Sequence, residues 1–136
     1  MASKIQISNP TAKLIGFIPT RDAALARTFY ESTLGLRFVS DDNFALVFDS
    51  NGTMIRVVRA PDFQPFPFTL LGWEVPDIDA AVADLTAKSV QFARYSFLEQ
   101  SPSGVWTAPG NSAKVAWFPD PDGNLLSLSQ HQAATT

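Results

Sequence analysis

V-A-W-F-P-D-P-D-G-N-L-L-S-L-S-Q, residues 115–130, is the stretch that decides the fold. It predicts two short strands joined by a tight turn. Asp120 opens the turn, Pro121 fixes φ for the next position, and Gly123 supplies the left-handed residue that closes it. Leucines alternate with serines in the second strand, so one face belongs to a core and Ser127 lies on the opposite face.

The composition describes a globular chain of one domain. The 136 residues are 46% hydrophobic and 17% charged, which is enough to bury a core without crosslinks. A net charge of −3 argues against binding to nucleic acid or to an anionic membrane. The absence of cysteine excludes disulfides, thiolate metal sites and cysteine nucleophiles. The chain shows no signal peptide and no long apolar run, so we expect a soluble cytoplasmic protein.

The first half, residues 13–59, predicts one strand, a helix and then three more strands. The strands are expected at residues 13–20, 36–40, 44–48 and 53–59. Asp22 caps the helix, which extends through Leu34 with Leu25 and Phe29 on one face. Gly35 ends it. Residues 1–11 are polar and predict a loosely held arm.

The second half, residues 69–131, repeats this order after a linker at residues 60–68, whose three prolines exclude a central strand. Its helix is expected from Asp77 to about Lys88, with Val82 and Leu85 facing inward. D-A-A-L-A at residues 22–26 recurs as D-A-A-V-A at residues 79–83. The expected strands are residues 70–75, 91–97, 114–118 and 125–130, with a strand fragment at residues 105–107.

Each half is therefore a β-α-β-β-β unit, which exposes one whole sheet face if it stands alone. Two such units must pair to be stable. We predict an α+β fold, a single domain of residues 1–136, in which two paired βαβββ modules form a curved eight-stranded cup with helices outside.

Three segments resemble the vicinal oxygen chelate superfamily, which includes glyoxalases, bleomycin-resistance proteins and extradiol dioxygenases. They extend over most of the chain: Phe29-Tyr30 with Leu34-Gly35, W-E-V-P-D-I-D-A-A at 73–81, and F-P-D-P-D-G-N-L-L-S-L-S-Q at 118–130. The resemblance implies a cup whose enzymatic members hold one divalent metal. The implied ligands are His, Gln or Glu from the first and fourth strand of each half.

Carried over position by position, these ligands are absent. The four positions fall at Ile15, Arg56, Leu70 and Ser127. Two aliphatic side chains, an arginine and a serine do not form a cage for a divalent cation. The single histidine, His131, lies beyond the last strand. We therefore expect no metal and no cofactor, and the metal-dependent enzymes are a poor match.

Five side chains are candidates for a ligand site in the cup. Arg56 is either a rim residue in a salt bridge or an anchor for an anionic group. Glu74 is either an ion-pair partner, with Arg56 as a candidate, or a general base. Ser127 is either an inert wall or a hydrogen-bond donor. Phe48 and Trp106 are expected to be pocket walls.

Asp120, Asp122 and Asn124 resemble calcium ligands superficially. The run lacks the acidic residue that ends a calcium loop. These three residue types favour turns, so we interpret them as turn formers.

The leading functional hypothesis is a protein that binds a small planar or aromatic molecule in its cup without a metal, as the bleomycin-resistance branch does. The alternatives are a lyase, isomerase or dioxygenase with an atypical site, and a non-catalytic scaffold with a vestigial cup. The resemblance also implies a homodimer, arranged either side by side or by exchange of modules.

Overall fold

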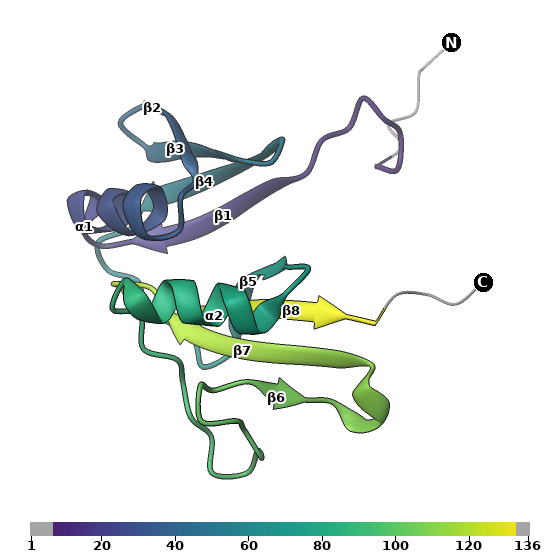
Figure 1. The fold of residues 1–136 in the computed structure, drawn as a ribbon. Coiled ribbons are helices and arrows are strands. Elements are labelled where there is room, and N and C mark those ends of the chain that lie inside the picture. Colours follow the sequence, from purple (N-terminus) through teal and green to yellow (C-terminus); the bar gives the residue numbers. More distant parts are fainter. Residues whose placement is uncertain (1–6, 133–136) are drawn as a thin grey trace.

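The computed structural model describes residues 7–132 (Figure 1), so the predicted arm lies partly outside the described residues. The first module contains β1 (Ile15–Thr20), α1 (Ala23–Arg27), the π-helical segment η1 (Thr28–Thr33), β2 (Arg37–Asp41), β3 (Ala45–Ser50) and β4 (Thr53–Arg59). The second contains β5 (Thr69–Glu74), α2 (Ile78–Ala87), β6 (Trp106–Thr107), the short 3-10 turn η2 (Pro109–Asn111), β7 (Ala113–Pro119) and β8 (Leu125–His131).

The two modules have the same topology. Each forms a four-stranded sheet, with the orders β1-β4-β3-β2 and β5-β8-β7-β6. The pairs β1–β4 and β5–β8 are parallel, and the other neighbours are antiparallel. The edge strands β1 and β5 lie next to each other (Figure 1). The predicted α+β fold of two βαβββ modules is confirmed, and the eight strands form no closed barrel in the described part of the chain.

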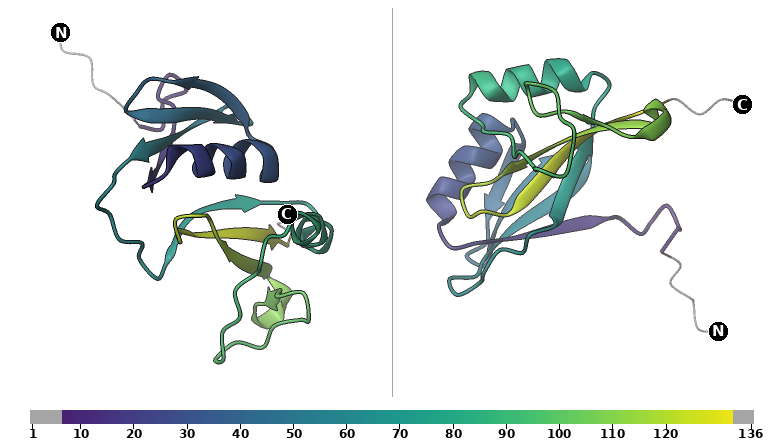
Figure 2. Two further views of the ribbon diagram at one scale, coloured as in Figure 1. Left: turned by 90° about the vertical axis from the view of Figure 1, so that its left-hand side faces the viewer. Right: turned by 90° about the horizontal axis from the view of Figure 1, so that it is seen from below.

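The helices cover one face of the sheets, and a single core joins the modules (Figure 2). Phe29 of the first module lies with its ring centroid 6.4 Å from that of Phe118 in the second. The fully buried core residues come from both halves and include Ile18, Tyr30, Phe48, Val57, Ile78, Val82, Phe118 and Leu126. Neither half therefore completes its core alone.

The first helix changes from α-helical to π-helical after Arg27. The Asp22 side chain accepts a hydrogen bond from the Leu25 backbone N–H at 3.2 Å, which confirms the predicted cap. Leu25, predicted to share a face with Phe29, is exposed, whereas Tyr30 is buried. The Leu34 N–H bonds the carbonyl of Phe29, five residues back, and this π turn rotates the later residues relative to an ideal α-helix.

The second helix shows that the sequence repeat is offset by two residues. Its cap is Asp77, with φ −142° and ψ 96°, almost the values of Asp22 (−141° and 97°). Asp22 thus corresponds to Asp77, not to Asp79 as the repeated D-A-A pattern predicts. The predicted burial of Val82 and Leu85 is confirmed.

The predicted strand at residues 91–97 is wrong, because this segment is a loop. Only one of its backbone N–H groups joins the sheet, that of Ala93, which bonds the carbonyl of Trp117 at 2.7 Å. The Gln100 side chain bonds the segment locally: it accepts from the Tyr95 N–H and donates to the carbonyls of Ala93 and Gly104. Hydrogen bonds to a side chain thus take the place of hydrogen bonds to a neighbouring strand.

The turn between β7 and β8 carries a buried carboxylate that binds the first module. Asp120 is 5% exposed and accepts four hydrogen bonds. Its partners are the Tyr30 hydroxyl at 2.6 Å, the Asn124 side-chain amide at 2.9 Å, and the backbone N–H groups of Asp122 and Asn124 at 2.9 Å each. Burial, followed by the nearby Asp120 charge, raises the pKa of Tyr30, which keeps its hydroxyl a donor.

Two further residues of this turn also reach across to the first module. Asp122 accepts from the Thr20 hydroxyl at 2.5 Å and from the Arg21 backbone N–H at 2.9 Å. The Asn124 side chain donates to the Pro19 carbonyl at 2.9 Å. We refer to Asp120, Asp122 and Asn124, with Pro19–Arg21 and Tyr30, as the inter-module clamp. The predicted turn formers therefore also fasten one module to the other.

Candidate ligand-binding site

Each sheet has a second face that no helix covers, which we call its free face. In the first module the core residues Ile18 and Val57 alternate with free-face residues such as Phe17 and Arg56. In the second module, buried leucines of β8 alternate with Ser127 and Ser129, which confirms the alternation predicted for that strand. The ligand positions implied by the resemblance all lie on these two free faces.

The register of the parallel strands shows which side chains are neighbours at those positions. Phe17 pairs with Arg56, Ile15 with Met54, and Gly72 with Ser127. This donor set does not fit a divalent metal, because an arginine, a serine and two aliphatic side chains stand where carboxylates or imidazoles are required. Within residues 7–132 no three His, Cys, Asp or Glu side chains gather in a way that could hold a metal ion.

Gly72 leaves room for the Ser127 hydroxyl. A Cβ atom at position 72 would lie 2.3 Å from Ser127 Oγ, but 3.4 Å or more from the other nearby atoms of that serine. Any side chain at position 72 would therefore displace the hydroxyl from its present rotamer.

Gly72→Ala is expected to lower the free energy of unfolding by about 1–2 kcal/mol, because Ser127 must take a strained rotamer. Adding Ser127→Ala should recover most of that loss, since the atoms that remain are at ordinary contact distance. Urea denaturation of the two single variants and the double variant measures the coupling. Additive losses would show that the hydroxyl does not occupy the space above Gly72.

An aromatic cluster covers the free face of the second sheet beside Ser127. Trp117 pairs with Ser127 across β7 and β8. The Trp117 ring centroid lies 6.2 Å from that of Trp106 and 5.6 Å from that of Tyr95, and Phe97 lies 5.5 Å from Tyr95. Alternation along β7 could have placed Trp117 in the site. Tyr95 was not predicted as a site residue, because it lies on the loop that the Gln100 side chain binds and not on a strand.

Arg56 is held by a carboxylate of its own sheet. Its Nη2 atom lies 2.6 Å from the Asp42 carboxylate, and 24% of its side chain is exposed. The partner is thus Asp42, and not Glu74 as the sequence suggested. The neighbouring Arg59 makes a two-pronged contact with Asp41, at 2.8 Å for each bond. A ligand anion would have to compete with Asp42 for this guanidinium.

These pairs predict a dependence of stability on pH. The hydrogen bond from Arg59 lowers the pKa of Asp41 from 3.8 to about 2, and the bond from Arg56 lowers that of Asp42. A carboxyl with a depressed folded-state pKa stabilises the fold above its unfolded pKa, and this contribution disappears as the pH falls through the folded value. Stability should therefore decline between about pH 4 and pH 2. Asp41→Asn should flatten this decline, as measured by urea denaturation at each pH; an identical pH profile would contradict it.

The remaining predicted site residues lie apart from the cluster. Phe48 is fully buried against Phe38 and Tyr30, with centroid distances of 5.6 and 6.0 Å, so its predicted role as a pocket wall is wrong. It points to the core because its strand pairing places it opposite Ile55. Glu74 is exposed and pairs with Ser129, at the end of the same free face as Trp106.

A cavity of about 560 Å³ lies under the linker, against the strands β5 and β8. Its sheet wall is formed by Pro19, Leu70 and Leu125, and its outer wall by linker aromatics, including the stacked rings of Phe66 and Phe68. The lining is almost wholly apolar, which suits a hydrophobic ring. The alternating Phe-Pro pattern of the linker is the sequence signal for this wall.

Comparisons with known proteins agree with this architecture. A glyoxalase/bleomycin resistance protein/dioxygenase from Alicyclobacillus acidocaldarius superposes with a TM-score of 0.68 at 19% identity, covering 93% of this chain and 96% of that one. TnmS3, an antibiotic binding protein from Streptomyces sp. CB03234, gives 0.68 at 24%, covering 95% and 100%. A superfamily member from Sphaerobacter thermophilus gives 0.65 at 25%, covering 88% and 96%. No curated protein matches the chain.

In residues 7–132 no helix combines the length and apolarity that a membrane crossing requires. The sequence model of one superfamily matches residues 12–128, nearly the whole of both modules. The chain belongs to the Glyoxalase/Bleomycin resistance protein/Dioxygenase superfamily.

Proposed function

We propose that this cytoplasmic protein binds a small planar, aromatic molecule on the free face of its second sheet, without a metal. The observation that carries the proposal is the cluster of Tyr95, Trp106 and Trp117 beside Ser127. These rings offer flat apolar surface at low entropic cost. The superfamily's ligand positions hold Arg56 and Ser127, which suit hydrogen bonding to a ligand oxygen better than coordination of a metal.

The likeness to TnmS3 supports a binding role over a catalytic one, because that protein is described as antibiotic binding. The linker cavity supports it further, since an apolar pocket of this volume matches the dimensions of drug-sized ligand sites. In this proposal Arg56 binds an anionic oxygen of the ligand after leaving Asp42.

The proposal includes a homodimer in which one copy supplies Arg56 and the other supplies the aromatic cluster. Arg56 lies on β4 of the first sheet, whereas Trp106 lies on β6 of the second. A band of exposed apolar side chains extends over β1, β4, β5 and the linker. Its members are Ile15, Phe17, Met54, Phe66, Phe68 and Leu70, which are 39–67% exposed. Such a band is typical of a surface that a second copy covers.

Calorimetric titration with a panel of planar antibiotics and aromatic acids tests the function. Trp106→Ala should weaken the binding of any ligand found by tenfold or more, because truncating a central aromatic contact commonly costs over 1 kcal/mol. Phe44→Ser is the control, since Phe44 is 78% exposed and lies in the turn between β2 and β3 of the first module. Unchanged affinity in Trp106→Ala, or an equal loss in Phe44→Ser, would contradict the proposed site.

A further inference from the structure

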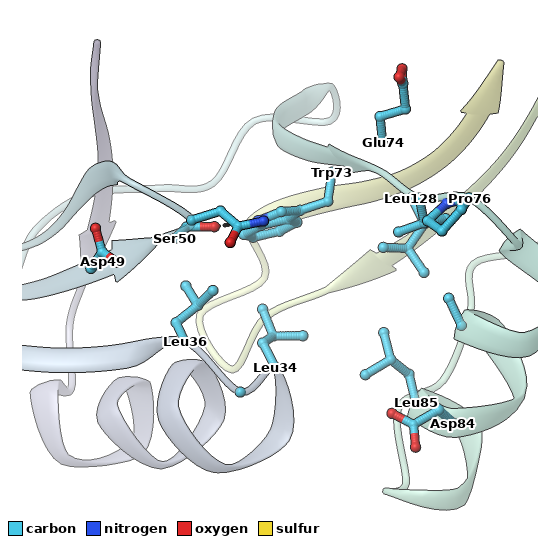
Figure 3. A pocket seen from close by; sticks show the side chains of 14 residues that line it. Leu34, Leu36, Asp49, Ser50, Trp73, Glu74, Pro76, Asp84, Leu85 and Leu128 are labelled. Atoms are coloured by element: carbon cyan, nitrogen blue, oxygen red, sulfur yellow. Dashed lines mark hydrogen bonds between the residues drawn. The ribbon is translucent and has the colours of Figure 1, made fainter. Parts of the chain in front are cut away.

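A second cavity, of about 480 Å³, lies between the modules on the helix side of the sheets (Figure 3). It is separate from the free faces. Its apolar wall comes from both modules and consists of Leu34, Leu36, Trp73, Leu85 and Leu128. The turn between β3 and β4, Asp49–Asn51, closes one side.

The internal repeat relates this cavity to the inter-module clamp, because equivalent positions of the two modules line both places. Tyr30 stands eight positions after the helix cap Asp22, and Leu85 stands eight positions after the cap Asp77. In the same way Asp120 follows the buried Phe118 by two positions, and Ser50 follows the buried Phe48 by two.

The two ends of the module boundary are therefore built differently. At the clamp, the Tyr30 phenol fills the space between helix and turn and bonds the Asp120 carboxylate. At the other end, Leu85 and Ser50 occupy the equivalent positions, and the volume that a ring fills at the clamp is open. The open space thus has a wall already shaped for a planar ring.

The wall is held in place by a bond between the modules. Trp73 Nε1 of the second module donates to Ser50 Oγ of the first at 3.0 Å, drawn as a dashed line in Figure 3. With its only donor engaged, the indole is fixed and presents a ring surface to the cavity. A fixed ring loses little entropy when a ligand packs on it.

The charged residues of the lining favour a cation. Asp49 and Asp84 lie on opposite sides of the cavity, whereas the Glu74 carboxylate points away (Figure 3). No Lys, Arg or His lines it. The partners of the two aspartates are exposed side chains outside the lining, Arg37 at 3.7 Å and Lys88 at 3.2 Å. Exposed pairs of this kind are weak and easily exchanged.

We propose that this cavity is a second binding site, which takes a compact aromatic ring that carries an ammonium group. The ring packs on Trp73 and Leu85, where the phenol of Tyr30 packs at the clamp. The ammonium group is attracted by Asp49 and Asp84, and by the indole face. Because both modules form the wall, the bound cation also stabilises the contact between them.

The three tryptophans of the chain allow a direct test. In Trp106→Phe/Trp117→Phe, Trp73 is the only tryptophan, so its emission reports this cavity alone. Titration with 2-phenylethylammonium should change that emission saturably. The matched anion 3-phenylpropionate should bind at least tenfold more weakly. About 10 mM of the cation is enough to fill a site with a Kd near 1 mM. If no saturable change occurs up to that concentration, the proposal is overturned. An equal response to the anion would overturn it as well.

Two variants in the single-tryptophan background separate the roles of shape and charge. Leu85→Tyr restores the ring found at the clamp and should abolish cation binding by filling the cavity. Asp84→Asn, at a side chain that is 64% exposed and tolerant of change, should weaken the cation about threefold or more and leave the weak anion binding unchanged or stronger. Asp62→Asn, at an exposed aspartate outside the cavity lining, is the charge control. Equal losses of cation affinity in Asp84→Asn and Asp62→Asn would count against the site, whatever the result with Leu85→Tyr.

Discussion

Asp120→Ala is expected to lower the free energy of unfolding by about 3–5 kcal/mol, because it removes the acceptor of four hydrogen bonds in a buried place. The Tyr30 hydroxyl would then lack a partner in the core, and the Asn124 side-chain amide would keep only its bond to the Pro19 carbonyl. Since the two modules share that core, the whole chain should lose stability in one transition. Urea denaturation followed by fluorescence and by circular dichroism measures both the loss and its cooperativity.

Tyr30→Phe isolates one of these bonds and should cost about 1–3 kcal/mol, since the carboxylate stays buried with one donor fewer. Tyr95→Phe is the matched control, because this tyrosine lies on a partly exposed surface loop and not in the clamp. A loss below about 0.5 kcal/mol in Asp120→Ala, or equal losses in the two tyrosine variants, would show that the clamp does not hold the modules together.

The second large effect is the rescue of binding by mixed dimers. Arg56→Ala and Trp106→Ala should each weaken the ligand by about tenfold or more, because one removes the anion anchor and the other an aromatic wall. If each site combines Arg56 of one copy with Trp106 of the other, a dimer of one chain of each kind has one intact site and one doubly damaged site. Such dimers should bind with wild-type affinity at half the wild-type stoichiometry.

The mixed dimers can be made by unfolding and refolding the two variants together and purified through different tags. Calorimetric titration then gives affinity and stoichiometry separately. Mixed dimers with the same weak affinity as both parents would show that each site belongs to one chain. Refolded dimers of each variant alone are the control, and they should remain weak.

Local chemistry made most of the fold predictable. Alternation in the last strand, the cap at Asp22 and the left-handed position at Gly35 each act within a few residues, and the structure has all three. The failures arose at two hydrogen bonds that join residues five positions apart and that the sequence pattern does not reveal. Gln100 turns the predicted strand at residues 91–97 into a loop, and the π turn before Leu34 shifts which helix residues are buried.

The candidate site was predictable in its residue types and less so in its arrangement. Alternation places Arg56 and Ser127 on free faces, as the strands require. It could not show that Asp42 would take the Arg56 guanidinium, because that contact depends on the shape of a hairpin. Phe48 was misplaced because all residues of its strand from 45 to 48 are buried, so hydrophobicity alone does not distinguish the two faces.

The inter-module clamp also bears on the order of folding during synthesis. Thr20 and Asp122 are 102 positions apart in the chain, and Tyr30 and Asp120 are 90 apart. When the first module leaves the ribosome, the Tyr30 hydroxyl therefore has no acceptor yet. The part of the core that the second module covers is still exposed. Contacts of such long range form late and slow the folding of a small domain. The nascent first half should consequently be a substrate for chaperones until the β7–β8 hairpin has been made.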